Sequence, residues 1–197
     1  MAHNDIEIEI KIPLDETNFF RVKEKLKETA KFVKKTQQTD DYFTPLHRNF
    51  VEPEFPFEWL SIRKRGDKTI LNYKHWHPEN VEISTHCDEF ETEIKNQDKL
   101  EKIFSAIDIK KLITVEKERE VYIYEDKFEI ALDAVKELGY FIEVETIKDF
   151  GNVEVAREKL FEFAKNLGID ISKTDKRGYP YLLMEKKGLI KTNDKPK

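Results

Sequence analysis

Two glutamates and a lysine alternate with isoleucines near the start of the chain, at Glu7, Glu9 and Lys11. An alternation with a period of two predicts a β-strand that has two unlike faces. The simplest interpretation is an amphipathic strand whose charged face meets solvent. Carboxylates can also supply oxygen ligands to a hard divalent cation such as Mg²⁺ or Mn²⁺, so the segment is a candidate for metal chemistry.

The same alternation of charged and apolar residues recurs in several later segments. The carboxylates in these patterns are Glu7, Glu9, Glu91, Glu93, Asp133, Glu143 and Glu145, and the cations are Lys11, Arg63, Arg65, Lys74, Lys117 and Arg119. If these faces point inward, one cavity holds both sets. An isolated buried charge is costly, so such a cavity must bring in counter-charges. The alternative is a sandwich whose charged faces meet solvent.

A cavity of this kind would suit a polyphosphate. Arg and Lys bind phosphate oxygens, and Arg can bind two of them at once. Carboxylates would hold Mg²⁺ or Mn²⁺, which would bridge to the phosphates. Because phosphoryl transfer needs mainly alignment and charge stabilisation, we expect a metal-dependent reaction on a small triphosphate.

Strands joined by hairpins or by single helices account for most of the chain. Helical spacing and capping residues predict helices at about 16–29, 98–107, 152–167 and 178–184, the second with Leu100, Ile103 and Phe104 as its core face. Strands are predicted near 5–12, 31–39, 41–43, 59–65, 69–74, 89–94, 113–120, 121–124, 128–135 and 140–145. Loops are expected at 45–57 and over most of 75–87. Twisted antiparallel strands tend to close, so we predict an α+β fold, a barrel of about eight antiparallel strands with flanking helices.

Length and composition restrict the class of protein. The chain has 197 residues and no visible internal boundary, so we expect one domain over 1–188 and a polar tail over 189–197. The net charge of −5 does not favour nucleic acid as a partner. Cys87 is the only cysteine, which suits a reducing compartment. No membrane span or signal peptide is visible, so we expect a cytoplasmic protein; a homodimer stays open.

The motifs also follow one another in the order and spacing of a known family. Glu7-x-Glu9-x-Lys11 is followed by Leu60-Ser61-Ile62-Arg63, Leu71-Asn72-Tyr73-Lys74, the acidic pair Glu91 and Glu93, Lys117-x-Arg119, Leu132-Asp133-x-Val135 and Gly139-x-Phe141-x-Glu143-x-Glu145. Together they resemble the CYTH superfamily, the triphosphate tunnel metalloenzymes, over nearly the whole chain.

The resemblance implies an eight-stranded antiparallel tunnel that hydrolyses or cyclises a triphosphate with a divalent metal. By analogy, Glu7, Glu9, Glu143 and Glu145 face the metal, Asp133 supports them, and Lys11, Arg63, Lys74, Lys117 and Arg119 bind phosphate; Lys11, Arg63 and Asp133 form the expected catalytic group. Ser61 departs from the pattern, because the family usually has an arginine there. Arg65, which is in phase with Arg63, is expected to compensate.

Two segments resemble one branch of that family, the class IV adenylyl cyclases, which convert ATP to cyclic AMP and pyrophosphate. These are the run from Gln38 to Phe43 and the run Arg177-Gly178-Tyr179. The same tunnel can hydrolyse thiamine triphosphate or inorganic tripolyphosphate, depending on whether a ribose hydroxyl or a water is aligned on phosphorus. A module that binds a polyphosphate without turnover is the alternative from another class. Tyr179 either fills the core or contacts a base.

The histidines give a weaker signal. His75, His77 and His86 lie near Cys87 in the sequence, but their spacing matches no common zinc pattern. We therefore expect no zinc site in this segment.

Overall fold

The computed structural model describes residues 6–81, 84–175 and 177–190, and one antiparallel sheet forms its largest part. The strands are β1 (Ile6–Glu7), β2 (Glu9–Leu14), β3 (Lys31–Pro45), β4 (Glu58–Arg65), β5 (Lys68–His77), β6 (His86–Glu93), β7 (Ile109–Tyr124), β8 (Phe128–Val135) and β9 (Gly139–Thr146). The helices are α1 (Glu16–Thr29), α2 (Gln97–Ala106), α3 (Val153–Asn166) and α4 (Gly178–Lys186), with a 3₁₀ turn at Ile171–Lys173. The predicted tail, 189–197, lies largely outside the described residues.

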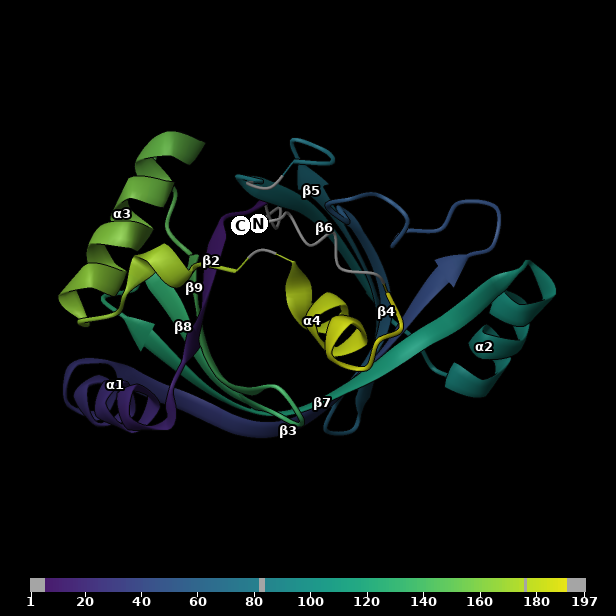
Figure 1. Ribbon diagram of the computed structural model, residues 1–197. Coiled ribbons are helices and arrows are strands. Elements are labelled where there is room, and N and C mark those ends of the chain that lie inside the picture. The colour runs from purple at the N-terminus through teal and green to yellow at the C-terminus, as the bar shows by residue number, and fades with distance from the viewer. Residues whose placement is uncertain (1–5, 82–83, 176, 191–197) are drawn as a thin grey trace.

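The N-terminal segment joins the two ends of the curled sheet. The strand order is β1-β6-β5-β4-β3-β7-β8-β9-β2, and only Ile8 separates β1 from β2. Since β1 pairs with β6 and β2 pairs with β9, the strands form a ring (Figure 1). The sheet of nine strands is one of eight when β1 and β2 are taken as two halves of one strand, which confirms the predicted antiparallel tunnel.

Two strands are longer than the sequence predicts. β3 runs through the residues expected as separate strands at 31–39 and 41–43, and β7 runs through 113–120 and 121–124. The two strands pair with each other, with register shifts between Phe32 and Lys34 and between Tyr42 and Phe43. The extra residues of these two shifts are Val33 in β3 and Leu112 in β7, so neither shift lies where the sequence pattern predicts a break. The predicted loop at 75–87 is also shorter, because β5 reaches His77 and β6 begins at His86.

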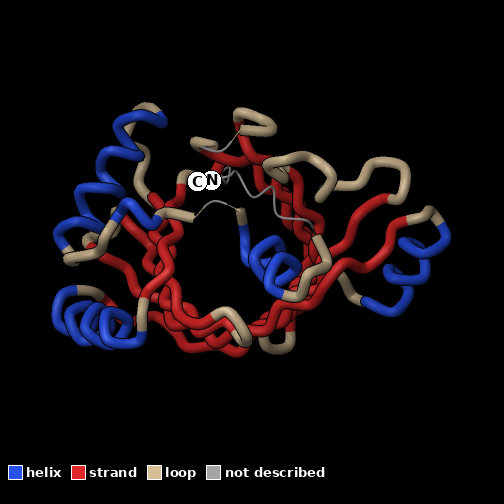
Figure 2. The backbone as a smooth tube through the Cα atoms, viewed as in Figure 1, coloured by secondary structure: helices blue, strands red, loops and turns tan. Residues whose placement is uncertain are grey.

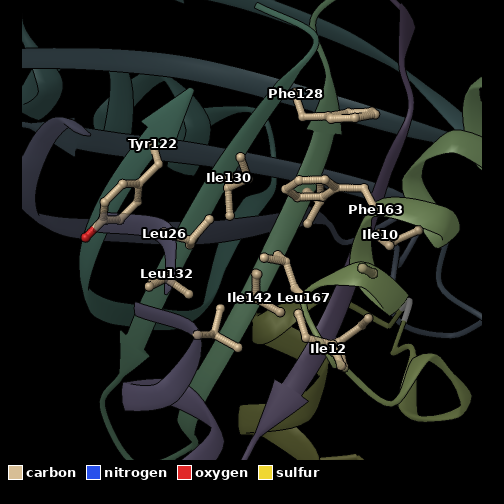
Figure 3. Close-up of a cluster of buried hydrophobic side chains, with 14 of the residues drawn as sticks. Ile10, Ile12, Leu26, Tyr122, Phe128, Ile130, Leu132, Ile142, Phe163 and Leu167 are labelled. Carbon is tan, nitrogen blue, oxygen red and sulfur yellow. The ribbon is translucent and has the colours of Figure 1, made fainter. Parts of the chain in front are cut away.

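Helices α1 and α3 cover the apolar outer face of one side of the ring (Figures 1 and 2). Helix α1 begins after Asp15, whose side chain accepts the Asn18 N–H at 2.8 Å, as its cap predicts. Leu26 of α1 packs against the β2, β8 and β9 side chains that Figure 3 shows, together with Phe163 and Leu167 from the α3 side. In α2, Phe104 is buried as predicted, but Ile103 is 55% exposed, so the expected core face of that helix is only partly correct.

Helix α4 occupies the inside of the ring and is the predicted short C-terminal helix (Figures 1 and 2). Its residues Tyr179, Leu183 and Met184 are buried against a second apolar cluster that includes Trp59 and Phe141. The helix therefore fills part of the tunnel and leaves the rest to polar side chains. Among the described helices, none is long and apolar enough to cross a membrane.

Candidate active site

The inner face of the ring encloses a cavity of about 270 Å³. Because side chains alternate along a strand, strands that turn isoleucines toward the outer helices turn their charged residues inward. The lining carboxylates are Glu7, Glu9, Asp40, Glu89, Glu91, Glu129, Glu143, Glu145 and Asp175, and the lining cations are Lys11, Arg63, Arg65, Lys74, Lys117 and Arg119. Two opposite sets of charge thus share one small volume.

Lys74 on β5 is the centre of the first charge cluster. Its ammonium group donates to Glu7 and lies 3.9 Å from a Glu9 oxygen and 3.6 Å from a Glu89 oxygen. Burial acts to lower the pKa of Lys74, but the charges of these three carboxylates outweigh burial and raise the pKa well above its ordinary value. Lys74 therefore stays a positive charge where β5, β6 and the N-terminal segment meet.

Arg63 on β4 lies beside this cluster. Its Nη1 donates to Glu89 and to Glu91, at 3.0 Å each, and Asn72 donates to the same two carboxylates at 2.5 and 3.0 Å. Its Nε is buried and has no hydrogen-bond partner in the described part of the chain. An unpaired buried donor is costly, and an acceptor oxygen supplied by a ligand would remove that cost.

Arg65 extends the same inward row of β4. Its Nη1 donates to Asp40 at 2.5 Å, and Asp40 is almost fully buried. Burial acts to raise the pKa of Asp40, but the hydrogen bond and the charge of Arg65 outweigh it and lower that pKa. Ser61, where the family has an arginine, is fully buried and lies 3.5 Å from the Asn72 side-chain oxygen.

Asp133 on β8 is the centre of the second charge cluster. It accepts from Arg119 at 2.7 and 2.5 Å, from Lys117 at 3.2 Å and from the Tyr179 hydroxyl at 2.8 Å. Its side chain is fully buried behind these groups and is not part of the cavity lining. Arg119 also donates to Glu143. Asp133 thus fixes the cations from behind the cavity wall.

Carboxylates lie side by side on three adjacent strands. Glu145 of β9 is in register with Glu9 of β2 on one side and with Glu129 of β8 on the other. Burial, the charge of Glu9 and, to a lesser extent, that of Glu129 raise the pKa of Glu145 to about 8. Burial likewise raises the pKa of Glu7 to about 9, although Lys74 opposes this. This edge of the cavity therefore holds more carboxyl groups than its cations can pair with.

The donor set suits a hard divalent cation, although the ligands are not gathered around one point. Across 6–81, 84–175 and 177–190, no three His, Cys, Asp or Glu side chains form a cluster that could hold a metal ion as they stand. Their oxygens are instead turned to cations, as Glu7 is to Lys74 and Glu143 to Arg119. Carboxylate oxygens are the ligands that Mg²⁺ and Mn²⁺ take, so the residues fit such an ion by type.

The structure brings most of the predicted site residues together. All six predicted cations line the cavity, as do Glu7, Glu9, Glu91, Glu143, Glu145 and Tyr179. Glu93 does not: its side chain is 61% exposed and pairs with Lys68 at 3.3 Å. It shares the phase of Glu91, but it lies at the last residue of β6, beyond the cavity.

Sequence reasoning missed Glu89, Glu129 and Asp40 as lining residues. Glu89 precedes Glu91 by two residues and Glu129 precedes Asp133 by four, so both share the inward phase of a predicted residue. Asp40 sits in the segment that resembles the adenylyl cyclase branch and lies directly across from Arg63 on β4, so the pairing of β3 with β4, which the sequence does not show, gives it the inward face.

The histidine segment lies on β5 and β6 outside the cavity lining. The rings of His75, His77 and His86 stack in sequence, with centroids 4.5 and 5.3 Å apart. His77 contacts Asp88 at 2.9 Å and His75 contacts Glu79 at 2.9 Å. His75 and His77 are thus each paired with a carboxylate, and His86 Nδ1 lies 2.9 Å from the Thr85 hydroxyl.

Comparison with known proteins finds one family. Residues 5–179 match the CYTH domain. A curated relative from Methanocaldococcus jannaschii, named "Putative adenylate cyclase MJ0240", is 34% identical over 176 residues, which cover 88% of this chain and 96% of the relative.

Solved structures agree with this match. The PH1819 protein of Pyrococcus horikoshii is 32% identical, covers 91% of this chain and 99% of its own, and superposes with a TM-score of 0.76. HpAC1 of Hippeastrum, for which a dominant triphosphatase activity is stated, is 20% identical with a TM-score of 0.64, over 93% of this chain and 95% of its own. At that identity the likeness of HpAC1 extends to the fold alone.

Proposed function

The chain belongs to the CYTH domain family, and we propose that it is an enzyme that binds a small triphosphate in its tunnel and turns it over with a divalent metal ion. One observation carries the proposal: a row of cations and a row of carboxylates line the same cavity of about 270 Å³. Phosphate oxygens would satisfy the first row and a cation would satisfy the second. A structural barrel would need neither row.

The cations are the proposed phosphate-binding residues. Arg63 and Arg65 extend from β4, Lys74 from β5, Lys11 from β2, and Lys117 and Arg119 from β7. On this proposal a triphosphate chain would lie among these six cations. The free Nε of Arg63 would donate to one of its oxygens, and the ion pairs that now hold the cations would exchange carboxylate for phosphate.

The proposed metal ligands are Glu7, Glu9, Glu143 and Glu145, with Mg²⁺ or Mn²⁺ as the ion. When bound, the ion would neutralise phosphate charge and polarise the bond that breaks. Glu9 and Glu145 are in register on adjacent strands, so this chain already holds two of these carboxylates side by side. Release of Glu7 and Glu143 from Lys74 and Arg119 would accompany phosphate binding, since those cations would turn to the phosphates.

Cyclisation of ATP is the first candidate reaction. The name of the curated relative and the segment around Asp40 both point to it. The ribose 3′-hydroxyl would attack the α-phosphorus and pyrophosphate would leave.

Hydrolysis of tripolyphosphate or thiamine triphosphate is the second candidate. The six cations that line the cavity would bind the triphosphate chain, which these substrates share with ATP. Recognition would then rest on the chain itself and not on the group attached to it.

Product analysis tests the proposal. The protein is incubated with Mg²⁺ or Mn²⁺ and, separately, with ATP, tripolyphosphate or thiamine triphosphate, and the products are separated by chromatography. Cyclic AMP with pyrophosphate would support cyclisation, and orthophosphate without cyclic AMP would support hydrolysis. Binding of all three without turnover would overturn the enzyme proposal in favour of a binding module. Lys68→Ala removes an exposed lysine of β5 that lies outside the cavity lining, so this variant should give the same products as wild type.

A further inference from the structure

Tyr179 of α4 lies between two of the proposed phosphate-binding lysines. The Lys11 ammonium is 4.5 Å from the centre of its ring, and the Lys117 ammonium is 4.8 Å from it. The ring is almost fully buried and packs edge-on against Phe141, with centroids 4.9 Å apart. Its hydroxyl donates to Asp133 at 2.8 Å. Packing and this hydrogen bond together fix the orientation of the ring.

The two lysines differ from the other four cations in their partners. Arg63, Arg65, Lys74 and Arg119 each have a carboxylate oxygen at 3.0 Å or closer. Among the described residues, the nearest carboxylate oxygen to Lys11 is at 3.8 Å, beyond hydrogen-bond distance, and Lys117 donates to a single one at 3.2 Å. The oxygen near Lys117 belongs to Asp133, which also accepts from Arg119 and Tyr179. The tyrosine ring therefore supplies part of what a carboxylate supplies elsewhere.

We propose that Tyr179 is a positioning residue, whose ring holds the ammonium groups of Lys11 and Lys117 in place for a triphosphate without neutralising them. This inference rests on the proposed triphosphate binding. The face of an aromatic ring attracts a cation through its quadrupole and carries no net charge. A carboxylate in the same place would have to be displaced by phosphate, whereas the ring can keep its contact while both lysines bind oxygen.

Tyr179 lies near the start of α4, and the segment before this helix is hydrogen-bonded to the strand that carries Lys11. Lys11 extends from β2 and Lys117 from β7, which β8 and β9 separate in the strand order, and α4 lies inside the ring (Figure 1). The backbone N–H of Asp175, three residues before the helix, donates to the Lys11 carbonyl at 2.8 Å. The C-terminal helix is thus tied to the strand whose lysine it orients.

The test separates the ring from the hydroxyl. Affinity for tripolyphosphate is measured by calorimetry without metal, on the full chain, for wild type, Tyr179→Phe and Tyr179→Leu. Tyr179→Phe keeps the ring, so we expect its affinity to stay within about threefold of wild type, and Tyr179→Leu should lose about tenfold or more. Adding Lys117→Met should cost less affinity in Tyr179→Leu than in wild type, because the two residues act together.

Tyr181→Leu is the matched control. Tyr181 is buried on the same helix, but it contacts Arg177 and does not line the cavity. The Tyr181→Leu variant should lose thermal stability as Tyr179→Leu does, but it should keep the affinity of wild type for tripolyphosphate. Equal affinity losses in both leucine variants, or none in Tyr179→Leu, would overturn the proposal. Failure of the wild type to bind tripolyphosphate would instead overturn the proposed function.

Discussion

Glu9, Glu145 and Glu129 lie next to one another on β2, β9 and β8, each directly across from the next. Like charges opposite each other destabilise a sheet, and burial increases the cost. Glu145 shows this cost directly, since its pKa is raised to about 8 by burial and by its neighbours. On the proposed function, this row lowers stability in exchange for cation binding, which is how functional sites commonly depart from folding rules.

Replacing Glu9 with alanine should therefore separate stability from function. We expect Glu9→Ala to lower metal-dependent turnover by about 100-fold or more, because a metal ligand is lost. Its unfolding temperature without metal should equal or exceed that of wild type, since repulsion with Glu145 is relieved. Both are measured in parallel with Glu93→Ala, the exposed glutamate at the end of β6, which should change neither. Wild-type turnover in Glu9→Ala would contradict the metal assignment.

The alternation of charged and apolar residues along each strand predicts most of the cavity residues, because one inward residue on a strand fixes the phase of the others. It could not tell how far along a strand the cavity extends, so Glu93 was included and Glu89 left out. The alternation also does not show that Asp133 lies behind the cavity wall, because the burial of a side chain depends on which side chains from other strands cover it. The roles of these residues stay predictions.

At the scale of elements, helices were predictable from caps and spacing, as the Asp15 cap of α1 shows. The long strands β3 and β7 were not, because both continue through the residues near Asp40 and Val121 where the sequence pattern predicts breaks. The place of α4 inside the ring was also beyond sequence reasoning. Its buried tyrosines look alike in sequence, and only tertiary packing separates Tyr179, which lines the cavity, from Tyr181.

The buried face of helix α1 should contribute more to the stability of the protein than the exposed face of α2. Leu26 is fully buried between α1 and the sheet, so Leu26→Ala should lower the free energy of unfolding by about 2–5 kcal/mol. Ile103→Ala in α2 removes a largely exposed side chain and should change it by less than about 1 kcal/mol. Urea unfolding measures both. Equal losses would show that α2 is packed as tightly as α1.

For the whole molecule, the buried carboxyls make stability depend on pH in two directions. Glu7 and Glu145 have pKa values of about 9 and about 8, above the ordinary 4.5, so the folded state binds more protons than the unfolded state between those limits. Their contribution is fully present below pH 4.5 and is lost as pH rises to 9. Burial alone would raise the pKa of Glu89, but the charge of Lys74 and a hydrogen bond from Glu7 lower it to about 2. The Glu89 contribution is therefore present above pH 4.5 and lost as pH falls toward 2.

The unfolding temperature without metal should therefore pass through a maximum near pH 5 and fall toward pH 9. A divalent cation can replace the protons of Glu7 and Glu145, so Mg²⁺ should raise the unfolding temperature more at pH 9 than at pH 6. Calorimetry in Mg²⁺ measures this against NaCl of equal ionic strength, which controls for screening. A magnesium effect independent of pH would contradict the assigned carboxyls.

The N-terminal segment pairs with β6 through β1 and with β9 through β2. This pairing determines when the ring can close during synthesis of the chain. β1 and β2 hydrogen-bond to strands that end at Glu93 and Thr146, so the ring cannot close until the chain has been synthesised through β9. Glu9 and Glu145 meet only at that closure. A nascent or truncated chain that lacks β9 therefore lacks Glu143 and Glu145, so the proposed metal site is complete only after the ring has closed.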